Sequence, residues 1–302
     1  MKTEVVLDRI GELKDKRKAI ILAHNYQIGE VQDVADFVGD SLQLSQMAAQ
    51  IREAEIIVFC GVHFMAETAA ILCPNKTVLI PEIKAGCPMA DMITASELIE
   101  WKKRYPGRKA VCYVNTTAEV KAECDICCTS SNALKIVDSV DGEEVLFAPD
   151  KNLAAYVARF TEKKIIPWDG CCYVHHRIML RDLNEKKRLY PEAEVWAHPE
   201  CRPEVIDMSD KVLSTGKMIL EARKTEKKEI IVATEAGIIY RMKKENPDKN
   251  FYPAKDIALC ANMRKIDLRK VLKSLEEMIY KIEVPRIISQ RARGAIQRMI
   301  EI

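Results

Sequence analysis

Short and almost continuous apolar runs alternate with longer stretches of helical periodicity along the whole chain. Continuous apolar runs are typical of parallel strands that are covered on both faces, and their alternation with helices is typical of α/β domains. We therefore expect strands in three groups of three. They cover residues 19–23, 55–59 and 77–80, then 110–114, 145–147 and 164–166, then 193–197, 229–233 and 250–252.

The last strand of each group leads into a proline, and these prolines stand at a constant interval. Pro81, Pro167 and Pro253 are 86 residues apart in each case. This repeat predicts an α/β fold of three similar three-layer αβα domains with parallel sheets, related by a pseudo-threefold axis. The expected domains are residues 1–84, 85–170 and 171–266, and the helices expected in residues 267–302 would pack back on the first.

Cysteines follow the proline in each copy, namely Cys87 in the first, Cys171 and Cys172 in the second, and Cys260 in the third. If the copies pack around one axis, one thiol from each converges on it. Three thiolates suit a metal cluster better than a disulfide, because a disulfide joins sulfurs in pairs. Spacing alone leaves the choice between Cys171 and Cys172 open.

Ligation by three cysteines indicates a particular kind of chemistry. Three thiolates can hold three corners of a [4Fe–4S] cluster, whereas four cysteines are the rule in electron transfer. The remaining iron would be open to substrate and could act as a Lewis acid, much as an open catalytic zinc does. This pattern therefore favours dehydration or carbonyl chemistry over electron relay.

The other cysteines have simpler interpretations. Cys60, Cys73 and Cys112 lie in or beside apolar runs and are expected to be small buried hydrophobic residues. Cys124, Cys127 and Cys128 contain one half of a zinc pattern, but the sequence offers no clear second half. Cys201 is expected to line the pocket without binding metal.

Composition narrows the function classes further. The net charge of the 302 residues is only +2, so nucleic acid is not an expected partner. The first residues lack the apolar core of a signal peptide, and no run reaches the ~18 apolar residues of a membrane span, so we expect a cytoplasmic protein without membrane contact. Eleven cysteines in such a chain indicate metal or redox chemistry instead of structural disulfides.

Polar side chains gather where the first strand of each copy ends. They are His24 and Tyr26, Tyr113 and Asn115, and His198 and Glu200. Ligands of parallel sheets bind beyond the carboxyl ends of the strands. Hydroxyl residues (Ser41, Ser130, Ser214 and Thr215) stand where helix N-caps belong. They could be simple caps, but three helix N-termini meeting at one axis would also make an anion pocket.

Taken together, these motifs resemble the quinolinate synthase A family of de novo NAD biosynthesis. The resemblance covers essentially the whole chain and rests on residues 23–27, 39–42, 113–115, 129–133, 172–175, 198–201 and 260–263. It implies three α/β domains and a [4Fe–4S] cluster held by Cys87, Cys172 and Cys260, with one open iron. The family's ligand precedes a Tyr-Val-His run, which selects Cys172 over Cys171.

The resemblance also implies a reaction, in which iminoaspartate and dihydroxyacetone phosphate condense to quinolinate with loss of two waters and phosphate. Tyr26 and Glu200 would serve the acid–base and dehydration steps. The residues implied to bind or polarise intermediates are His24, Tyr113, Asn115, His175 and His198, with Tyr113 and His198 counted among the catalytic groups. Ser41, Ser130, Ser214 and Thr215 would hold carboxylate or phosphate, and transient contact with an iminoaspartate-producing enzyme is implied.

The sequence departs from the family pattern at one point, and two other functions are alternatives to the one that the resemblance implies. Some members of the family carry a C-x2-C-x2-C run at the last ligand, but Cys260 stands alone, so a disulfide switch is not expected there. Another iron–sulfur hydro-lyase acting on a hydroxy acid would need no triose phosphate. A non-catalytic ligand-binding or zinc-stabilised repeat protein would be colourless, whereas a cluster enzyme purified without oxygen would be brown.

Overall fold

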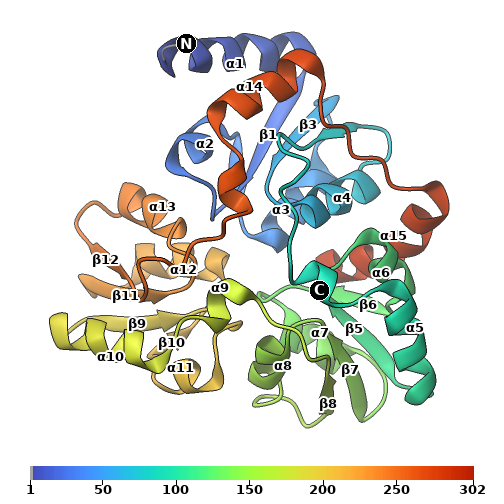
Figure 1. Cartoon of the computed structure of the whole chain (residues 1–302), viewed down its shortest axis with the longest axis vertical. Helices are drawn as coiled ribbons and strands as arrows, with labels where there is room; N and C mark the ends of the chain where they lie inside the picture. The colour runs from blue at the N-terminus through green and yellow to red at the C-terminus, as the bar shows by residue number, and fades with distance from the viewer. Residues whose placement is uncertain (1–2) are drawn as a thin grey trace.

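The computed structural model describes residues 3–302 and has three four-stranded, all-parallel sheets arranged around a common centre (Figure 1). The first sheet has the order β2-β1-β3-β4, with β1 Ala19–His24, β2 Phe37–Gly39, β3 Ile56–Cys60 and β4 Thr77–Leu79. The second has the order β6-β5-β7-β8, with β5 Lys109–Tyr113, β6 Ile126–Cys128, β7 Glu144–Ala148 and β8 Lys164–Pro167. The third has the order β10-β9-β11-β12, with β9 Glu194–Ala197, β10 Lys211–Val212, β11 Glu229–Ala233 and β12 Asn250–Pro253.

Helices connect and cover these strands. The first unit contains α1 Thr3–Arg17, α2 Gly29–Val34, α3 Ser41–Gln50 and α4 His63–Leu72. The second contains η1 Ala90–Met92, α5 Ala95–Arg104, α6 Ala118–Glu123, α7 Ala133–Ser139 and α8 Lys151–Val157. The third contains α9 Tyr173–His176, α10 Leu180–Leu189, α11 Pro203–Asp207, α12 Thr215–Lys224 and α13 Ile238–Glu245, and η2 Met263–Lys265, α14 Leu268–Glu277 and α15 Arg286–Glu301 follow.

The predicted α/β class with three similar units is confirmed, and each apolar run of the sequence forms a strand. All five residues of β3 are buried, as expected for a parallel strand covered on both faces. Each sheet also has an edge strand of only two or three residues (β2, β6 and β10), which the sequence did not predict. Such short strands carry too few residues to show a period.

Strand registers define which residues of the three units are equivalent. Ala23 pairs with Cys60, Cys112 with Ala148, and Ala197 with Ala233. The next residues along the first strand of each unit, His24, Tyr113 and His198, therefore occupy equivalent positions. Two residues further on, Tyr26, Asn115 and Glu200 are equivalent as well. The polar groups predicted to gather at the strand ends thus come from matching places in three copies.

The same registers correct one detail of the proline interval. Phe147 pairs with Pro167 and Val232 with Pro253, but in the first unit Val58 pairs with Leu79. Continuing that register makes Ile80 the equivalent of the two later prolines, so Pro81 lies one position beyond it. The three units are repeats of one another, but the three prolines that stand 86 residues apart do not all occupy the same structural position.

The C-terminal segment spans two units. Helix α14 packs against α1 in the first unit, whereas α15 packs against α6 and β6 in the second unit and against α4 in the first. Between them, Tyr280 exchanges backbone hydrogen bonds of 2.9 and 3.1 Å with Ile80, so the tail also covers the edge of the first sheet beside β4. The boundaries predicted for the three domains stay a prediction.

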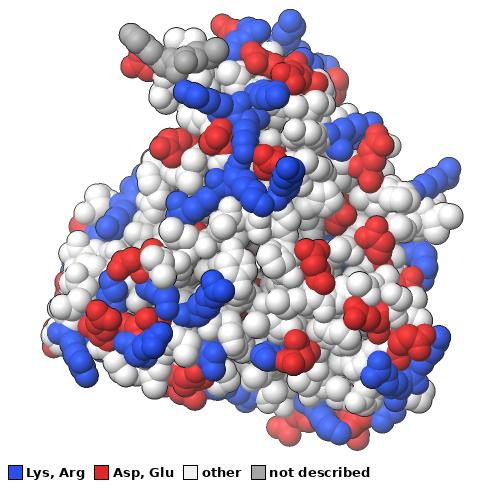
Figure 2. Space-filling view, in the orientation of Figure 1, with Lys and Arg blue, Asp and Glu red and all other residues white. Residues whose placement is uncertain are grey.

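The cysteines predicted to be small core residues, Cys60, Cys73 and Cys112, are buried. Cys127 and Cys128 belong to the buried strand β6, and the Cys124 sulfur lies 3.7 Å from that of Cys127. On the surface, acidic and basic side chains are interspersed over the face shown in Figure 2, in keeping with the small net charge. Within residues 3–302, no helix is both long and apolar enough to cross a bilayer.

Candidate active site

A cavity lies where the carboxyl ends of the three sheets face one another. The predicted site residues that line it are His24, Tyr26, Ser41, Cys87, Tyr113, Asn115, Ser130, Cys172, His175, His198, Glu200, Thr215 and Cys260. Ser214, by contrast, is buried behind the wall as the N-cap of α12. The structure therefore brings together residues that lie up to 236 positions apart in the sequence.

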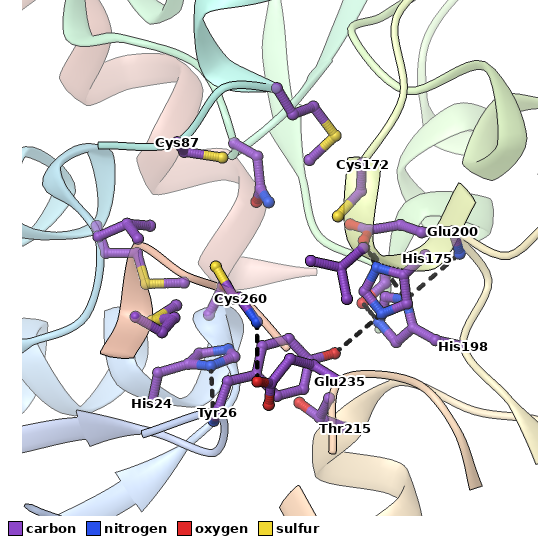
Figure 3. A pocket seen from close by; sticks show the side chains of 18 of the residues that line it. His24, Tyr26, Cys87, Cys172, His175, His198, Glu200, Thr215, Glu235 and Cys260 are labelled. Atoms are coloured by element: carbon purple, nitrogen blue, oxygen red, sulfur yellow. Dashed lines mark hydrogen bonds and ion pairs between the residues drawn. The ribbon is translucent and has the colours of Figure 1, made fainter. Parts of the chain in front are cut away.

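The sulfurs of Cys87, Cys172 and Cys260 point into the same part of this cavity (Figure 3). Each of these cysteines precedes one short helical turn (η1, α9 or η2), and a backbone N–H of that turn hydrogen-bonds to the sulfur. The donors three residues on are those of Ala90, His175 and Met263. Cys172 lines the cavity and Cys171 does not. The structure therefore distinguishes these two cysteines, which the spacing in the sequence could not.

These three cysteines fit a cluster of iron and sulfide. Burial raises the pKa of Cys87 to about 12, and it also raises the pKa of Cys172 and Cys260 above the ordinary value. Thiols in such surroundings become thiolates only next to positive charge, which bound metal supplies. Cys172 also brings its sulfur within 4.8 Å of donor atoms of His175 and Glu200, so a single cation would have a second set of donors here.

Two of the cysteine loops rest on buried carboxylates. Asp150 accepts a hydrogen bond of 2.9 Å from the backbone N–H of Cys172, and Glu235 accepts one of 3.0 Å from that of Cys260. Burial raises the pKa of Asp150 and of Glu235 to about 7. The strand registers make Val62 the equivalent residue of the first unit, so the support for Cys87 lacks this carboxylate.

The imidazoles of His24 and His198 are held by the same kind of hydrogen bond. In each, Nδ1 accepts a backbone N–H from two residues further on, from Tyr26 at 3.2 Å and from Glu200 at 3.3 Å. Burial lowers the pKa of His24 to about 4 and that of His198 to about 3, so both rings are neutral near pH 7. With Nδ1 accepting, the ring proton must be on Nε2, and in His198 it can donate to the Ser130 hydroxyl 3.2 Å away.

Glu200 stands beside a second histidine. Its Oε2 lies 2.6 Å from His175 Nδ1, and the His175 and His198 rings stack with centroids 4.5 Å apart. Burial raises the pKa of Glu200, but the neighbouring His175, His198 and Tyr113 together outweigh burial and bring the pKa down to about 2. Burial also raises the pKa of Tyr26 well above its ordinary value, so Tyr26 is a neutral phenol. The cavity therefore contains an ionised carboxylate and a neutral phenol.

The predicted hydroxyls occupy one equivalent position. The registers of the edge strands align Ser41, Ser130 and Thr215, each of which lines the cavity next to the start of a helix. Ser214 caps α12 as predicted, whereas α3 is capped not by Ser41 but by the residue before it, Asp40, which accepts from the Gln43 N–H at 2.9 Å. An N-cap residue stands just before the helix, and its side chain accepts a hydrogen bond from a backbone N–H of the first turn. Ser41 is the first residue of α3, so it cannot be the cap of that helix.

Asp40 links all three units. Besides capping α3, its carboxylate accepts hydrogen bonds from the Ser131 hydroxyl at 2.8 Å, the Gly216 N–H at 3.3 Å and the Ser214 hydroxyl at 3.4 Å. The pocket predicted from three helix N-termini therefore already contains one carboxylate of the protein at its edge. No sequence pattern indicated this role, since the residues equivalent to Asp40 are Thr129 and Ser214, neither of which carries a carboxylate.

Replacing Asp40 by alanine should lower the free energy of unfolding by about 1–3 kcal/mol, because one helix loses its cap and two hydroxyls, that of the buried Ser214 and that of the partly exposed Ser131, lose their acceptor. The measurement is urea unfolding under anaerobic conditions, followed by circular dichroism. Ser41→Ala is the matched control, one residue away, and should change stability by less than about 0.5 kcal/mol. Equal losses in the two variants would contradict the assigned role of Asp40.

Further functional candidates escaped the sequence analysis. Thr234 contacts both Tyr26 and His175, and Asp150 and Glu235 support the cysteine loops. Aligning the copies by register would have found the two carboxylates, because Asp150 and Glu235 are equivalent. The polar groups that the sequence indicated follow the first strand of each copy, whereas Asp150 and Glu235 follow β7 and β11.

Comparison with known proteins agrees with this geometry. The family model described as "Quinolinate synthetase A protein" matches residues 8–301. A quinolinate synthase of Dehalococcoides mccartyi is 58% identical over 302 residues, which is all of both chains. One of Thermodesulfovibrio yellowstonii is 54% identical over 98% of each chain, and one of Methanosarcina barkeri is 51% identical over all of this chain and 99% of its own.

Proposed function

This chain belongs to the quinolinate synthetase A family, and from that premise we propose that it condenses iminoaspartate with dihydroxyacetone phosphate to quinolinate, with loss of two waters and phosphate. The observation that carries the proposal is the single cavity in which three thiols, neutral histidines and helix-start hydroxyls from three units meet. Iminoaspartate hydrolyses readily, so transient contact with the enzyme that produces it would favour its transfer.

Cys87, Cys172 and Cys260 would hold a [4Fe–4S] cluster, and its open iron would supply a Lewis acid for the departure of a hydroxyl group as water. Their sulfurs are soft donors, they face one space, and they receive backbone hydrogen bonds that stabilise thiolates. Two substrates that are both anionic suit a cavity with several helix starts at its wall.

Substrate binding falls to neutral donors and acceptors of the chain. Ser41, Ser130 and Thr215 would donate hydrogen bonds to carboxylate or phosphate oxygens, with help from the free N–H groups of the helix starts. His24 and His198 would donate from Nε2 to a substrate oxygen. Asn115 Oδ1 is buried and has no hydrogen-bond partner within residues 3–302, so it is free to accept from a substrate N–H or hydroxyl.

Tyr26 and Glu200 would carry the protons. Glu200 is ionised near neutral pH and can remove a proton, whereas Tyr26 keeps its proton and can deliver it to a leaving hydroxyl. The lining of the same cavity also includes apolar side chains, among them Phe64, Met65 and Met263. A cavity with such walls limits water, and water would hydrolyse an imine before it condenses.

The test is anaerobic incubation of iron-replete protein with iminoaspartate and dihydroxyacetone phosphate, with detection of quinolinate by chromatography. We expect a brown protein and a product whose formation requires both substrates. No product from fully loaded protein would overturn the proposed reaction. Turnover of a hydroxy acid alone, without the triose phosphate, would instead indicate a hydro-lyase of a different specificity.

A further inference from the structure

Thr234 lies directly after β11, behind the cavity wall, and is 1% exposed. Its hydroxyl oxygen is 2.7 Å from the hydroxyl of Tyr26 and 2.8 Å from Nε2 of His175. The direct contact between Tyr26 and His175 is longer, at 3.3 Å. Thr234 therefore makes a shorter hydrogen bond to each of these two residues than they make to each other.

The connection continues to Glu200. On the other side of the imidazole, His175 Nδ1 lies 2.6 Å from Glu200 Oε2. Tyr26 follows β1, His175 lies on α9 and Glu200 follows β9, so segments distant in sequence meet in one line of polar atoms. The order of the groups is phenol, hydroxyl, imidazole and carboxylate. The two groups at its ends are those proposed above to move protons.

The repeat marks Thr234 as a departure from the common pattern. The strand registers place Gly61 and Pro149 at the equivalent positions of the first and second units, and neither carries a hydroxyl. Thr234 lies outside the cavity lining, whereas Tyr26, His175 and Glu200 line it. A buried hydroxyl that faces two active-site groups, and not the substrate, can act only through those groups.

We propose that Thr234 is a positioning residue that joins Tyr26 and Glu200, through His175, into one acid–base unit. The inference rests on the proton-transfer roles proposed above for Tyr26 and Glu200. The hydroxyl suits this place because it can accept a hydrogen bond from Tyr26 while it donates one to His175 Nε2. With Nε2 accepting, the imidazole proton is on Nδ1 and faces the carboxylate of Glu200.

One proton can pass along this line without a net change of charge at the two central groups, although the His175 proton ends on Nε2 instead of Nδ1. Tyr26 gives its proton to the Thr234 oxygen, Thr234 gives its own to His175 Nε2, and His175 Nδ1 gives its proton to Glu200. The result is a Tyr26 phenolate and a protonated Glu200, with Thr234 and His175 again neutral. The contact between Nδ1 and Glu200 is short but lacks hydrogen-bond alignment, so the last transfer requires a small reorientation of the carboxylate.

This unit would let one proton serve two steps of the reaction. A proton that Glu200 removes from the substrate can return along the same line to Tyr26, which restores a phenol able to protonate a leaving hydroxyl. The enclosed site then needs no exchange with bulk water between the steps. Without the Thr234 hydroxyl, Tyr26 and His175 keep only their 3.3 Å contact, so a slower reaction should remain.

The test compares Thr234→Val, which keeps the shape and removes the hydroxyl, with Thr234→Ser, which keeps the hydroxyl. Loss of one aligned proton carrier should lower kcat in Thr234→Val about tenfold to a hundredfold, less than loss of a whole acid–base group. KM should change by less than about twofold, and Thr234→Ser should recover at least half of the wild-type kcat. Iron and sulfide content must be equal in all three proteins.

Two further measurements separate positioning from packing. In a Tyr26→Phe background, Thr234→Val should cause no additional loss, because its partner is already absent. In ¹⁵N-histidine spectra of the anaerobic protein, assigned with a His175→Asn variant, Thr234→Val should shift the His175 ring nitrogens and Thr234→Ser should not. The spectra need no turnover, so they report on Thr234 even if the wild type forms no quinolinate.

The proposal is overturned by either of two results. One is a Thr234→Val enzyme with wild-type kcat and unchanged His175 resonances. The other is a Thr234→Ser enzyme as slow as Thr234→Val with the same cluster content, since that would show a packing role for the γ-methyl group. If the wild type makes quinolinate, both results leave the proposed reaction intact.

Discussion

Alanine in place of Cys87, Cys172 or Cys260 is expected to abolish quinolinate formation and to leave a protein that cannot hold an intact cluster. Each cysteine would supply one of three protein ligands, and two thiolates are too few to retain a cubane cluster in a site open on its fourth corner. The measurements are iron and sulfide content, the visible absorption of anaerobically purified protein, and turnover. Far-UV circular dichroism should show that each variant is folded.

The chain supplies a matched control for this experiment. Cys171 is the sequence neighbour of Cys172, it is partly exposed, and it does not line the cavity. Cys171→Ala should therefore keep both cluster and activity. Loss of the cluster in Cys171→Ala, or its full retention in any of the other three variants, would contradict the assigned ligand set.

Removal of the phenolic hydroxyl in Tyr26→Phe should reduce kcat by about 10²- to 10⁴-fold while the cluster remains, because a positioned acid contributes a factor of that size. Glu200→Gln should have an effect of the same order, since an amide cannot take up a proton. Steady-state turnover with both substrates measures kcat, and the visible spectrum verifies the cluster. Substrate affinity should change much less than kcat.

A tyrosine outside the cavity serves as control. Tyr240 is exposed, donates a hydrogen bond of 2.5 Å to Asp33 and does not line the cavity. Tyr240→Phe should retain wild-type turnover. A Tyr26→Phe enzyme with full activity would rule out the acid–base role of Tyr26, and with it the starting point of the line through Thr234.

The strands and most of the cavity lining were predictable because their causes are local. A strand buried on both faces needs an apolar run, and parallel topology places the ends of such runs at one edge of the sheet. The positions of His24, Tyr113 and His198 follow from these two facts and the repeat. The copies also explain why Cys87 and Cys260 could be singled out before the fold was known.

What escaped prediction depends on contacts between units. Asp40 bonds to Ser131 and Gly216 across the centre of the molecule, and no local pattern in its own helix reveals those partners. Thr234 acts through Tyr26, 208 residues away in the sequence. Helix α15 was expected to pack on the first unit, but it packs chiefly on α6 and β6 of the second. The sequence could not reveal this, because the apolar face of an amphipathic helix does not specify which apolar surface it covers.

The division of one cavity among three units has a thermodynamic consequence. Whatever binds there favours only the arrangement in which all three units are docked, so its binding free energy adds to the stability of the whole chain by mass action. A protein stripped of its ligands should thus loosen first at the seams, by which we mean the contacts between units around Asp40 and around the three cysteine loops. Resistance to proteases at these seams would report occupancy of the centre as directly as colour does.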